Sequence, residues 1–289
     1  MLRGRRPWSY DAAVRENKPS NTALGVVVVR AVHQLMDELP HILEDPVSPR
    51  LLSPETIQEI QAHPGRHRLP QSRGLRSAVV LRSRYAEDEL MSAVHSGLTQ
   101  FVSIGAGYDT FACRQPAWAH GLRILEVDHP ATQAAKREHF ARMGVAFPEN
   151  VAFLPHDLEA GELARALPGN GIDPTAPVFV ACLGVLTYLR PHTVERLLGE
   201  IAAMASGTRM VFTIASAERP HGTSTEDRAA AHGEPWLTRL DRGELEAVLR
   251  ESGFRQVSFL EPEESALRYY AGRHDLEPPQ RMRMCLAAV

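Results

Sequence analysis

The residues best suited to do chemistry are two glycines and an acidic residue that each follow a short apolar run. Gly105 and Gly107 come directly after the run at residues 101–104, and Asp128 ends a second run at residues 124–127. Glycines after a buried parallel strand let backbone N–H groups approach a ligand closely. An acid at the end of the next strand can accept hydrogen bonds from both hydroxyls of a ribose. The pairing predicts a nucleoside ligand.

The residues that follow the glycines distinguish two classes of nucleoside. A dinucleotide site prefers a third glycine where this chain has Thr110. Asp109 would also repel a pyrophosphate, whereas S-adenosylmethionine (SAM) brings a sulfonium and an ammonium to the same place. The turn therefore favours a cationic nucleoside. A nicotinamide dinucleotide site and an ordinary strand-to-helix turn are the alternatives.

Composition sets broad limits on the class of protein. The 289 residues, 44% hydrophobic with a formal net charge of −3, are typical of one large α/β domain with no bias toward nucleic acid or anionic membranes. Cys113, Cys182 and Cys285 lie far apart, which argues against a disulfide framework and a thiolate metal site and favours a cytoplasmic location. No apolar run approaches the roughly 20 residues of a membrane helix, so a small-molecule partner is expected.

Apolar runs and helical patterns alternate through most of the chain. Strands are predicted at 101–104, 124–127, 151–158, 177–182 and 209–214, with helices at 75–98, 130–143, 191–205 and 241–252. This alternation predicts a parallel sheet covered by helices on both faces, with ligands held at the carboxyl ends of the strands. Two late strands, 256–260 and 282–289, are expected to complete the sheet with an antiparallel end.

The first quarter of the chain is predicted to form a helical cap, residues 1–74, on a main domain of residues 75–289. Residues 1–21 are expected to be a tail, and 22–40 a helix, because the valine run at 26–29 continues with helical spacing. Prolines divide residues 40–74, leaving one short helix at 54–62. This segment carries a basic cluster that we interpret as solvated surface rather than a contact for an acidic substrate: Arg66, His67, Arg68, Arg73 and Arg76.

Further candidate ligand contacts lie just before the first strand and at the end of the third. Arg82 or Arg84 could hold a ligand carboxylate bidentately, or could instead pair with a neighbouring acid at the surface. Asp157 could accept from an adenine amino group while Leu158 packs against the ring. The alternative for Asp157 is the cap of a helix that begins near Glu159.

The acceptor side of the site is less well defined by the sequence. Residues 215–237 are predicted to be a mobile connection beside the site, and Tyr188, His221, His232 and Trp236 are candidates to shape an acceptor pocket. His192, His221 or His232 could act as a general base, although a histidine in such a position is more often a surface group. No catalytic base is therefore assigned.

The run from Leu81 to Leu189 resembles the leucine carboxyl methyltransferase family through LRSRY, SIGAGYDT, LEVDHP, HDL and LGVLTYL, in that order. The resemblance implies a Rossmann-like class I methyltransferase fold, with a seven-stranded, mostly parallel sheet, helices on both faces and an N-terminal helical cap. It also implies SAM as cofactor. The residues at the matching positions are Arg82 for the methionine carboxylate, with Arg84 as the alternative, Gly105 and Gly107 for the turn, Asp128 for the ribose, and Asp157 and Leu158 for the adenine.

The chain departs from the family pattern at Phe111, where many bacterial relatives carry arginine, and at Leu183, where the phosphatase enzyme has glutamate. Both departures lie on the acceptor side, so the family name does not give the substrate. Leu183 and Tyr188 predict an apolar acceptor pocket, with Arg114 or basic residues of 66–76 neutralising an acceptor oxygen.

The resemblance implies a SAM-dependent O-methyltransferase acting on a carboxylate or hydroxyl of a small molecule or peptide in bacterial secondary metabolism. A carboxylate is favoured because it is already ionised at neutral pH and needs no base. The alternatives are an NAD(P)-dependent oxidoreductase that uses the same glycine turn and a non-catalytic SAM-binding protein. No nucleic acid, membrane or metal partner is expected.

Overall fold

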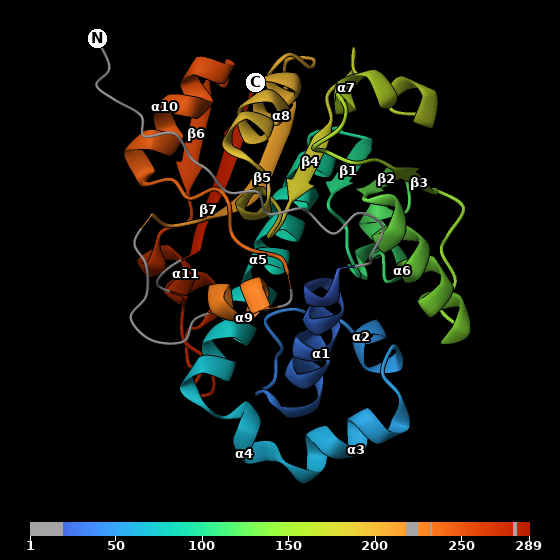
Figure 1. Cartoon of the computed structure of the whole chain (residues 1–289), viewed down its shortest axis with the longest axis vertical. Coiled ribbons are helices and arrows are strands. Elements are labelled where there is room, and N and C mark those ends of the chain that lie inside the picture. Colours follow the sequence, from blue (N-terminus) through green and yellow to red (C-terminus); the bar gives the residue numbers. More distant parts are fainter. Residues whose placement is uncertain (1–19, 218–224, 232, 280–281) are drawn as a thin grey trace.

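A single mixed sheet forms the centre of the protein, for which a computed structural model describes residues 20–217, 225–231, 233–279 and 282–289. The strand order is β3-β2-β1-β4-β5-β7-β6 (Figure 1). The strands are β1 Gln100–Ile104, β2 Arg123–Asp128, β3 Val151–Pro155, β4 Phe179–Cys182, β5 Arg209–Ala215, β6 Gln256–Phe259 and β7 Met282–Ala288. Only β7 runs antiparallel to its neighbours, which confirms the predicted mostly parallel sheet with an antiparallel end.

Both faces of the sheet are buried, which explains why its strands read as continuous apolar runs. Val102 and Leu125 belong to the core cluster on one face of the sheet, whereas Phe101 and Ile124 belong to the cluster on the opposite face. Cys182 is fully buried in the first cluster, as expected for a small core residue.

Helices cover the two faces separately (Figure 1). α5 (Pro70–His95) packs in the cluster that contains Phe101, and α6 (Pro130–Arg142) lies on the same face, where Lys136 pairs with Glu126 at 2.6 Å. α7 (Leu163–Ala166), α8 (Pro191–Ala202) and α10 (Arg242–Ser252) cover the opposite face. This arrangement brings the carboxyl ends of β1 to β6 to one edge, together with the amino end of β7.

Some element boundaries differ from those predicted. α5 begins at Pro70 instead of residue 75, because proline at the first helical position has its φ already set for a helix, and it ends before Gly97, whose φ is +95°. It therefore runs across the predicted limit between cap and main domain, and that division stays a prediction. β3 ends at Pro155 rather than residue 158, because the chain turns at Asp157, whose carbonyl accepts from the N–H groups of Ala160 and Gly161.

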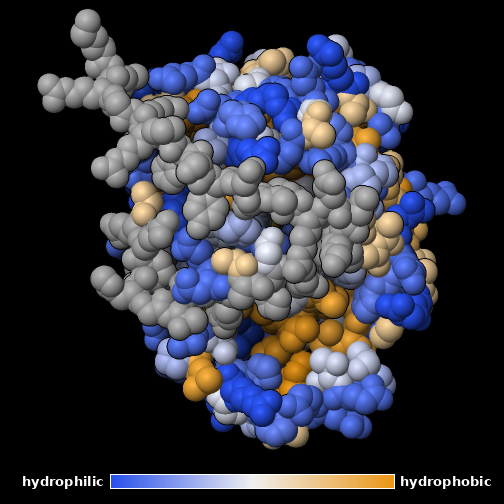
Figure 2. All heavy atoms as spheres, in the orientation of Figure 1, coloured by the Kyte–Doolittle hydropathy of each residue, from blue (hydrophilic) through white to orange (hydrophobic). Residues whose placement is uncertain are grey.

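The cap consists of α1 (Asn21–Met36), α2 (Val47–Arg50), α3 (Pro54–Ala62) and α4 (Pro64–His67). Its valine run is helical and α3 has the predicted bounds, so both predictions are confirmed. Val27 and Val32 share a core cluster with Tyr108 and Phe140, which attaches the cap beside the glycine turn. Figure 2 shows hydrophobic side chains gathered over α1, where Leu24 is 41% exposed.

The structure adds two short helices in the last third of the chain, α9 (Thr225–Ala231) and α11 (Pro262–Tyr269). α9 lies within the segment predicted to be a mobile connection. His221 and His232, the histidines predicted to shape the acceptor pocket, lie outside the described residues. None of the helices that the structure describes is both long and apolar enough to span a membrane.

Candidate cofactor and acceptor site

The glycine turn closes the end of β1 onto β2. The N–H groups of Gly105 and Ala106 donate to the Val127 carbonyl at 2.8 and 3.2 Å. Gly105 has a φ of +63° and Gly107 a φ of +49°, a region that residues with a Cβ rarely adopt. A Cβ on Gly105 would also overlap the Val185 side chain. The turn therefore requires glycine for its conformation and for the close approach of its neighbours.

Asp128 stands at the end of β2, facing that turn. Its Oδ2 accepts from the Gly107 N–H and its Oδ1 accepts from the His129 N–H at 2.6 Å. Burial raises the pKa of Asp128, and the two hydrogen bonds only partly oppose this rise. Because each carboxylate oxygen carries a second lone pair, the group can still accept from two ribose hydroxyls. The geometry fits the predicted ribose contact.

Arg82 has no charged partner among the residues that the structure describes. Its guanidinium packs against Gly184, which has a φ of +74° and where an added Cβ would overlap Nη1. Among the described residues it forms no ion pair, and its buried Nε has no hydrogen-bond partner. Burial and the positive charge of Arg30 lower the pKa of Arg82 to about 10. A desolvated cation of this kind is suited to a carboxylate ligand, which guanidinium can bind bidentately.

Arg84 is in a different situation, although it is only two residues further along α5. Two residues turn the helix by about 200°, so its side chain points away from Arg82. Its Nε pairs with Asp88 Oδ1 at 2.9 Å and its side chain is 41% exposed. The surface pairing that the sequence offered as the alternative for Arg84 is the one that the structure has.

Asp157 and Leu158 follow β3, beside the end of β2. Asp157 Oδ1 accepts from the Glu159 N–H at 2.9 Å, and the Asp157 carbonyl accepts from the N–H groups of Ala160 and Gly161. The carboxylate thus stabilises a turn rather than the start of a helix. Leu158 is only 9% exposed and packs in the core, so little of its side chain is open to a ligand.

Asp109 corrects one step of the sequence argument. Its Oδ2 pairs with Arg30 Nη2 at 2.6 Å, and its Oδ1 accepts from the Phe111 N–H at 2.7 Å. Burial raises the pKa of Asp109, but Arg30, Arg114 and Lys136 together lower it well below its usual range. The carboxylate is therefore ionised and already neutralised within the protein. It does not discriminate between a cationic ligand and a pyrophosphate as the sequence suggested.

Comparison with known proteins decides the family. The family model described as leucine carboxyl methyltransferase matches residues 23–202, which is more than half of the chain. A proposed SAM-dependent methyltransferase of Frankia alni is 31% identical over 234 residues, 76% of this chain and 77% of that protein. The chain belongs to the leucine carboxyl methyltransferase family. SAM is the cofactor named for its relatives, so the predictions of family and cofactor are confirmed.

Other relatives of the family match over part of their length. YktD of Bacillus subtilis, also a proposed SAM-dependent methyltransferase, is 29% identical over 67% of this chain and 66% of its own length. A Mycobacterium avium relative matches over 44% of its length. The crystal structure of a proposed methyltransferase from Thermobifida fusca superposes with a TM-score of 0.55 at 17% identity, covering 95% of this chain and 96% of that one. This likeness confirms the predicted Rossmann-like class I methyltransferase fold.

Arg114, predicted to neutralise an acceptor oxygen, is instead part of a buried ion network. Its two terminal nitrogens donate to the Glu87 carboxylate, one of them at 3.0 Å, and its Nε donates to Thr110 Oγ1 at 3.1 Å. Burial lowers the pKa of Arg114, but Glu87 and then Asp45 raise it to a net value above its usual range. The prediction is wrong in its chemistry, because this guanidinium is fully occupied and only 6% exposed.

Arg76, which the sequence analysis placed in a solvated basic cluster, is also buried. Arg76 is 4% exposed, and its Nε and Nη2 both donate to Asp37, at 2.6 and 2.8 Å. It attaches α5 to the end of α1 rather than lying on solvated surface. Arg66 fits the surface interpretation, since it is 67% exposed and pairs with Glu59.

The predicted acceptor residues that the structure describes lie after β4 and β5. Leu183 and Tyr188 are half-buried in the loop that follows β4, and Tyr188 acts electrostatically on Arg82. Trp236 is half-buried with the Arg239 guanidinium 5.0 Å from its ring centre. His192 is exposed at the start of α8, which is the ordinary surface position considered from the sequence.

Sequence reasoning missed Gly184 and Arg30. The Gly184 N–H donates to Thr213 Oγ1 at 2.7 Å, and the absence of a side chain makes room for Arg82. The available signal was a glycine two residues after the predicted strand 177–182, comparable with Gly105 after the strand at 101–104. Arg30 had no such signal, because its partner Asp109 is far away in the sequence.

Proposed function

We propose that this family member is a SAM-dependent O-methyltransferase that esterifies a carboxylate of a small molecule or peptide, in bacterial secondary metabolism. The observation that carries the proposal is the Arg82 guanidinium, which forms no ion pair with a described residue and lies beside the loop after β4, while Asp128 stands at the end of β2. A cation for an amino-acid carboxylate and an acid for a ribose are the two ends of SAM.

SAM, when bound, supplies a methyl group already activated by its sulfonium. The residues of the chain then have to position the two reactants and exclude water. Arg82 would hold the methionine carboxylate and Asp128 the ribose hydroxyls. Gly107 would let the backbone come close to the part of SAM between them. Asp157 would contact the adenine edge through the carboxylate oxygen that the turn leaves available.

A carboxylate acceptor is supported by the character of the acceptor side. Leu183, Tyr188 and Trp236 are half-buried and offer apolar surface, and the described residues there include no buried histidine poised as a base. A carboxylate is ionised at neutral pH and needs no base to attack a methyl group. Removal from water by apolar neighbours would raise its reactivity.

Two measurements test the proposal. Calorimetry with SAM, S-adenosylhomocysteine and NAD should give binding of the first two only, and tight binding of NAD without SAM would refute the cofactor assignment. Labelled SAM and candidate acids should then give a product that releases labelled methanol in mild alkali. An alkali-stable product would overturn the ester while leaving methyl transfer intact, and SAM binding without turnover on any acceptor would favour a non-catalytic binding protein.

A further inference from the structure

One face of α1 lies along the glycine turn, just beyond the carboxyl ends of the strands (Figure 1). Ala23, Val27 and Arg30 occupy this face, because residues at intervals of three or four positions lie on the same side of a helix. A Cβ built on Gly107 would lie 3.3 Å from the Ala23 Cβ. Val27 shares a core cluster with Tyr108. The cap therefore forms one wall of the turn in the candidate cofactor site.

Arg30 extends this contact to the residues that follow the glycines. Its Nη2 donates to Asp109 Oδ2 at 2.6 Å, and its Nη1 donates to Thr110 Oγ1 at 3.2 Å. The Asp109 N–H in turn donates to the Ala106 carbonyl at 2.8 Å, which closes the turn. The guanidinium thus holds the two residues at the end of the turn from the side of the cap.

The same guanidinium joins the turn to the helix that carries Arg82. Arg30 Nη2 donates at 2.7 Å to the Oγ of Ser83, the residue after Arg82, and Asp45 of the cap lies 3.6 Å from Arg30 Nη1. Thr110 Oγ1 also donates to Asp45, at 2.7 Å. The Arg30 side chain is 3% exposed and that of Asp45 is fully buried. Buried networks of this kind fix one geometry, because no water competes for their hydrogen bonds.

We propose that Arg30 is a positioning residue for the cofactor, which holds the glycine turn where the Gly107 N–H points toward Asp128. This inference rests on the proposed function, because it takes the turn and Asp128 as the cofactor site. A hydrogen bond joins Gly107 to Asp128, so a shift of the turn would move both the backbone that approaches SAM and the carboxylate that receives the ribose. Arg30 acts through the turn, and the cap is therefore part of the cofactor site.

A direct electrostatic effect of Arg30 on the ligand is the competing explanation. After the larger effect of burial, the positive charge of Arg30 lowers the pKa of Arg82, so the two guanidinium groups lie near each other. Arg30 is nevertheless matched by Asp109 and Asp45, and a charge neutralised in this way adds little attraction for a ligand carboxylate. The two explanations differ for a nucleoside without the methionine end. A displaced turn weakens its binding, whereas the loss of a charge near the carboxylate does not.

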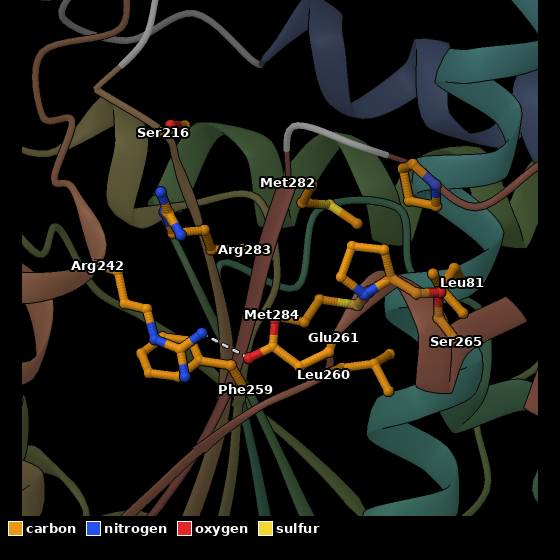
Figure 3. Close-up of a pocket in the computed structure, with 12 residues that line it drawn as sticks. Leu81, Ser216, Arg242, Phe259, Leu260, Glu261, Ser265, Met282, Arg283 and Met284 are labelled. Atoms are coloured by element: carbon orange, nitrogen blue, oxygen red, sulfur yellow. Dashed lines mark hydrogen bonds and ion pairs between the residues drawn. The ribbon is translucent and has the colours of Figure 1, made fainter.

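The cavity in Figure 3 is a different part of the same edge of the sheet. It lies beyond β5, where the ends of β5 and β6 and the start of β7 meet α11. Leu81 of α5 lines it, but none of its described lining residues belongs to α1 or to the glycine turn. A nucleoside bound in this cavity instead of at the turn would be insensitive to Arg30.

Calorimetry tests the assignment with S-adenosylhomocysteine and with methylthioadenosine, which keeps the nucleoside and lacks the methionine end. Arg30→Met should weaken the binding of both at least roughly tenfold, because Gly107 and Asp128 contact the part that the two ligands share. Arg76→Met is the matched control, since Arg76 is also a buried arginine and binds Asp37 at the other end of α1. It should lower stability in the same way and leave both affinities within twofold.

A folded Arg30→Met variant that binds both ligands within twofold of the natural chain would overturn the inference. Weaker binding of S-adenosylhomocysteine alone would also overturn it, because Arg30 would then act on the carboxylate. Should that variant fail to fold, Ala23→Leu crowds Gly107 without removing a buried charge, and unchanged affinities there count against the inference equally. These results refute the role of Arg30 alone, whereas a natural chain that binds neither ligand refutes the proposed function.

Discussion

Replacing Arg82 by methionine should change stability and ligand affinity in opposite directions. In the protein without ligand, the guanidinium is held partly out of water, and no described residue supplies it with a counter-ion. Methionine keeps the apolar stem and removes the charge. If Arg82 is the residue that holds the SAM carboxylate, the same substitution removes the strongest polar contact at that end of the cofactor.

The magnitude follows from the pKa. Burial and Arg30 lower the pKa of Arg82 from its ordinary 12.5 to about 10. At 1.36 kcal/mol per pKa unit, keeping the charge costs about 2 to 3 kcal/mol, after allowance for screening by the solvent that reaches the side chain. Arg82→Met should therefore raise the melting temperature by roughly 4 to 8 °C. Affinity for SAM should fall by about 2 to 4 kcal/mol, which is roughly 30-fold to 1,000-fold.

The sign of the pH dependence is fixed by the same values. A base with a lowered pKa in the folded state destabilises the fold at every pH below that pKa, and the penalty disappears only as pH rises through about 10 toward 12.5. The stability gained by Arg82→Met should therefore be the same at pH 6 and pH 8. Differential scanning fluorimetry without ligand measures it, and calorimetry with SAM measures the affinity.

Arg84→Met is the matched control, on the same helix and with the same change of side chain. Arg84 is 41% exposed and paired with Asp88, so its removal should alter stability by less than about 1 kcal/mol and leave SAM affinity unchanged. An Arg82→Met variant that is less stable than the natural chain and still binds SAM within twofold would refute the reasoning. A loss of SAM affinity in the Arg84 variant would show that the carboxylate had been assigned to the wrong arginine.

Three further outcomes are expected. Asp128→Ala should weaken SAM binding by about 2 to 4 kcal/mol in calorimetry, because two charge-assisted hydrogen bonds lose their acceptor, and a change within twofold would contradict the ribose assignment. Arg114→Ala should lower the free energy of unfolding by about 3 to 5 kcal/mol in urea titration, because Glu87 is left as a buried charge without its partner. Near-normal stability of this variant would show that the pair is dispensable. The lowered pKa of Asp109 adds stability that is present above its ordinary pKa near 4 and is lost as pH falls further. Asp109→Asn should therefore make stability fall less steeply with acid pH. An unchanged acid dependence would exclude Asp109 as its source.

The positions of the strands, the glycine turn and the acid at the end of β2 could be predicted from sequence because each depends on local patterns. Gly105 and Asp128 directly follow apolar runs, and in a parallel sheet the ends of such runs meet at one edge. The helix through Val27 was also predictable, since its later residues repeat with helical spacing although valine alone favours a strand. These signals need no knowledge of what lies across the fold.

The fate of the charged side chains depended on tertiary structure. The residue pattern alone left Arg82 and Arg84 as alternatives, and the family resemblance favoured Arg82. The direction in which α5 packs places Arg82 beside Gly184, with no ion pair to any described residue, and Arg84 on the surface with Asp88. Arg114 was predicted to neutralise an acceptor oxygen, but its guanidinium is bound to Glu87. A charge is neutralised by whichever groups the fold brings within a few ångströms, and these come from distant parts of the chain. The sequence by itself therefore determined the sheet and the cofactor edge, whereas only the packing of the helices decided which cations remain available to a ligand.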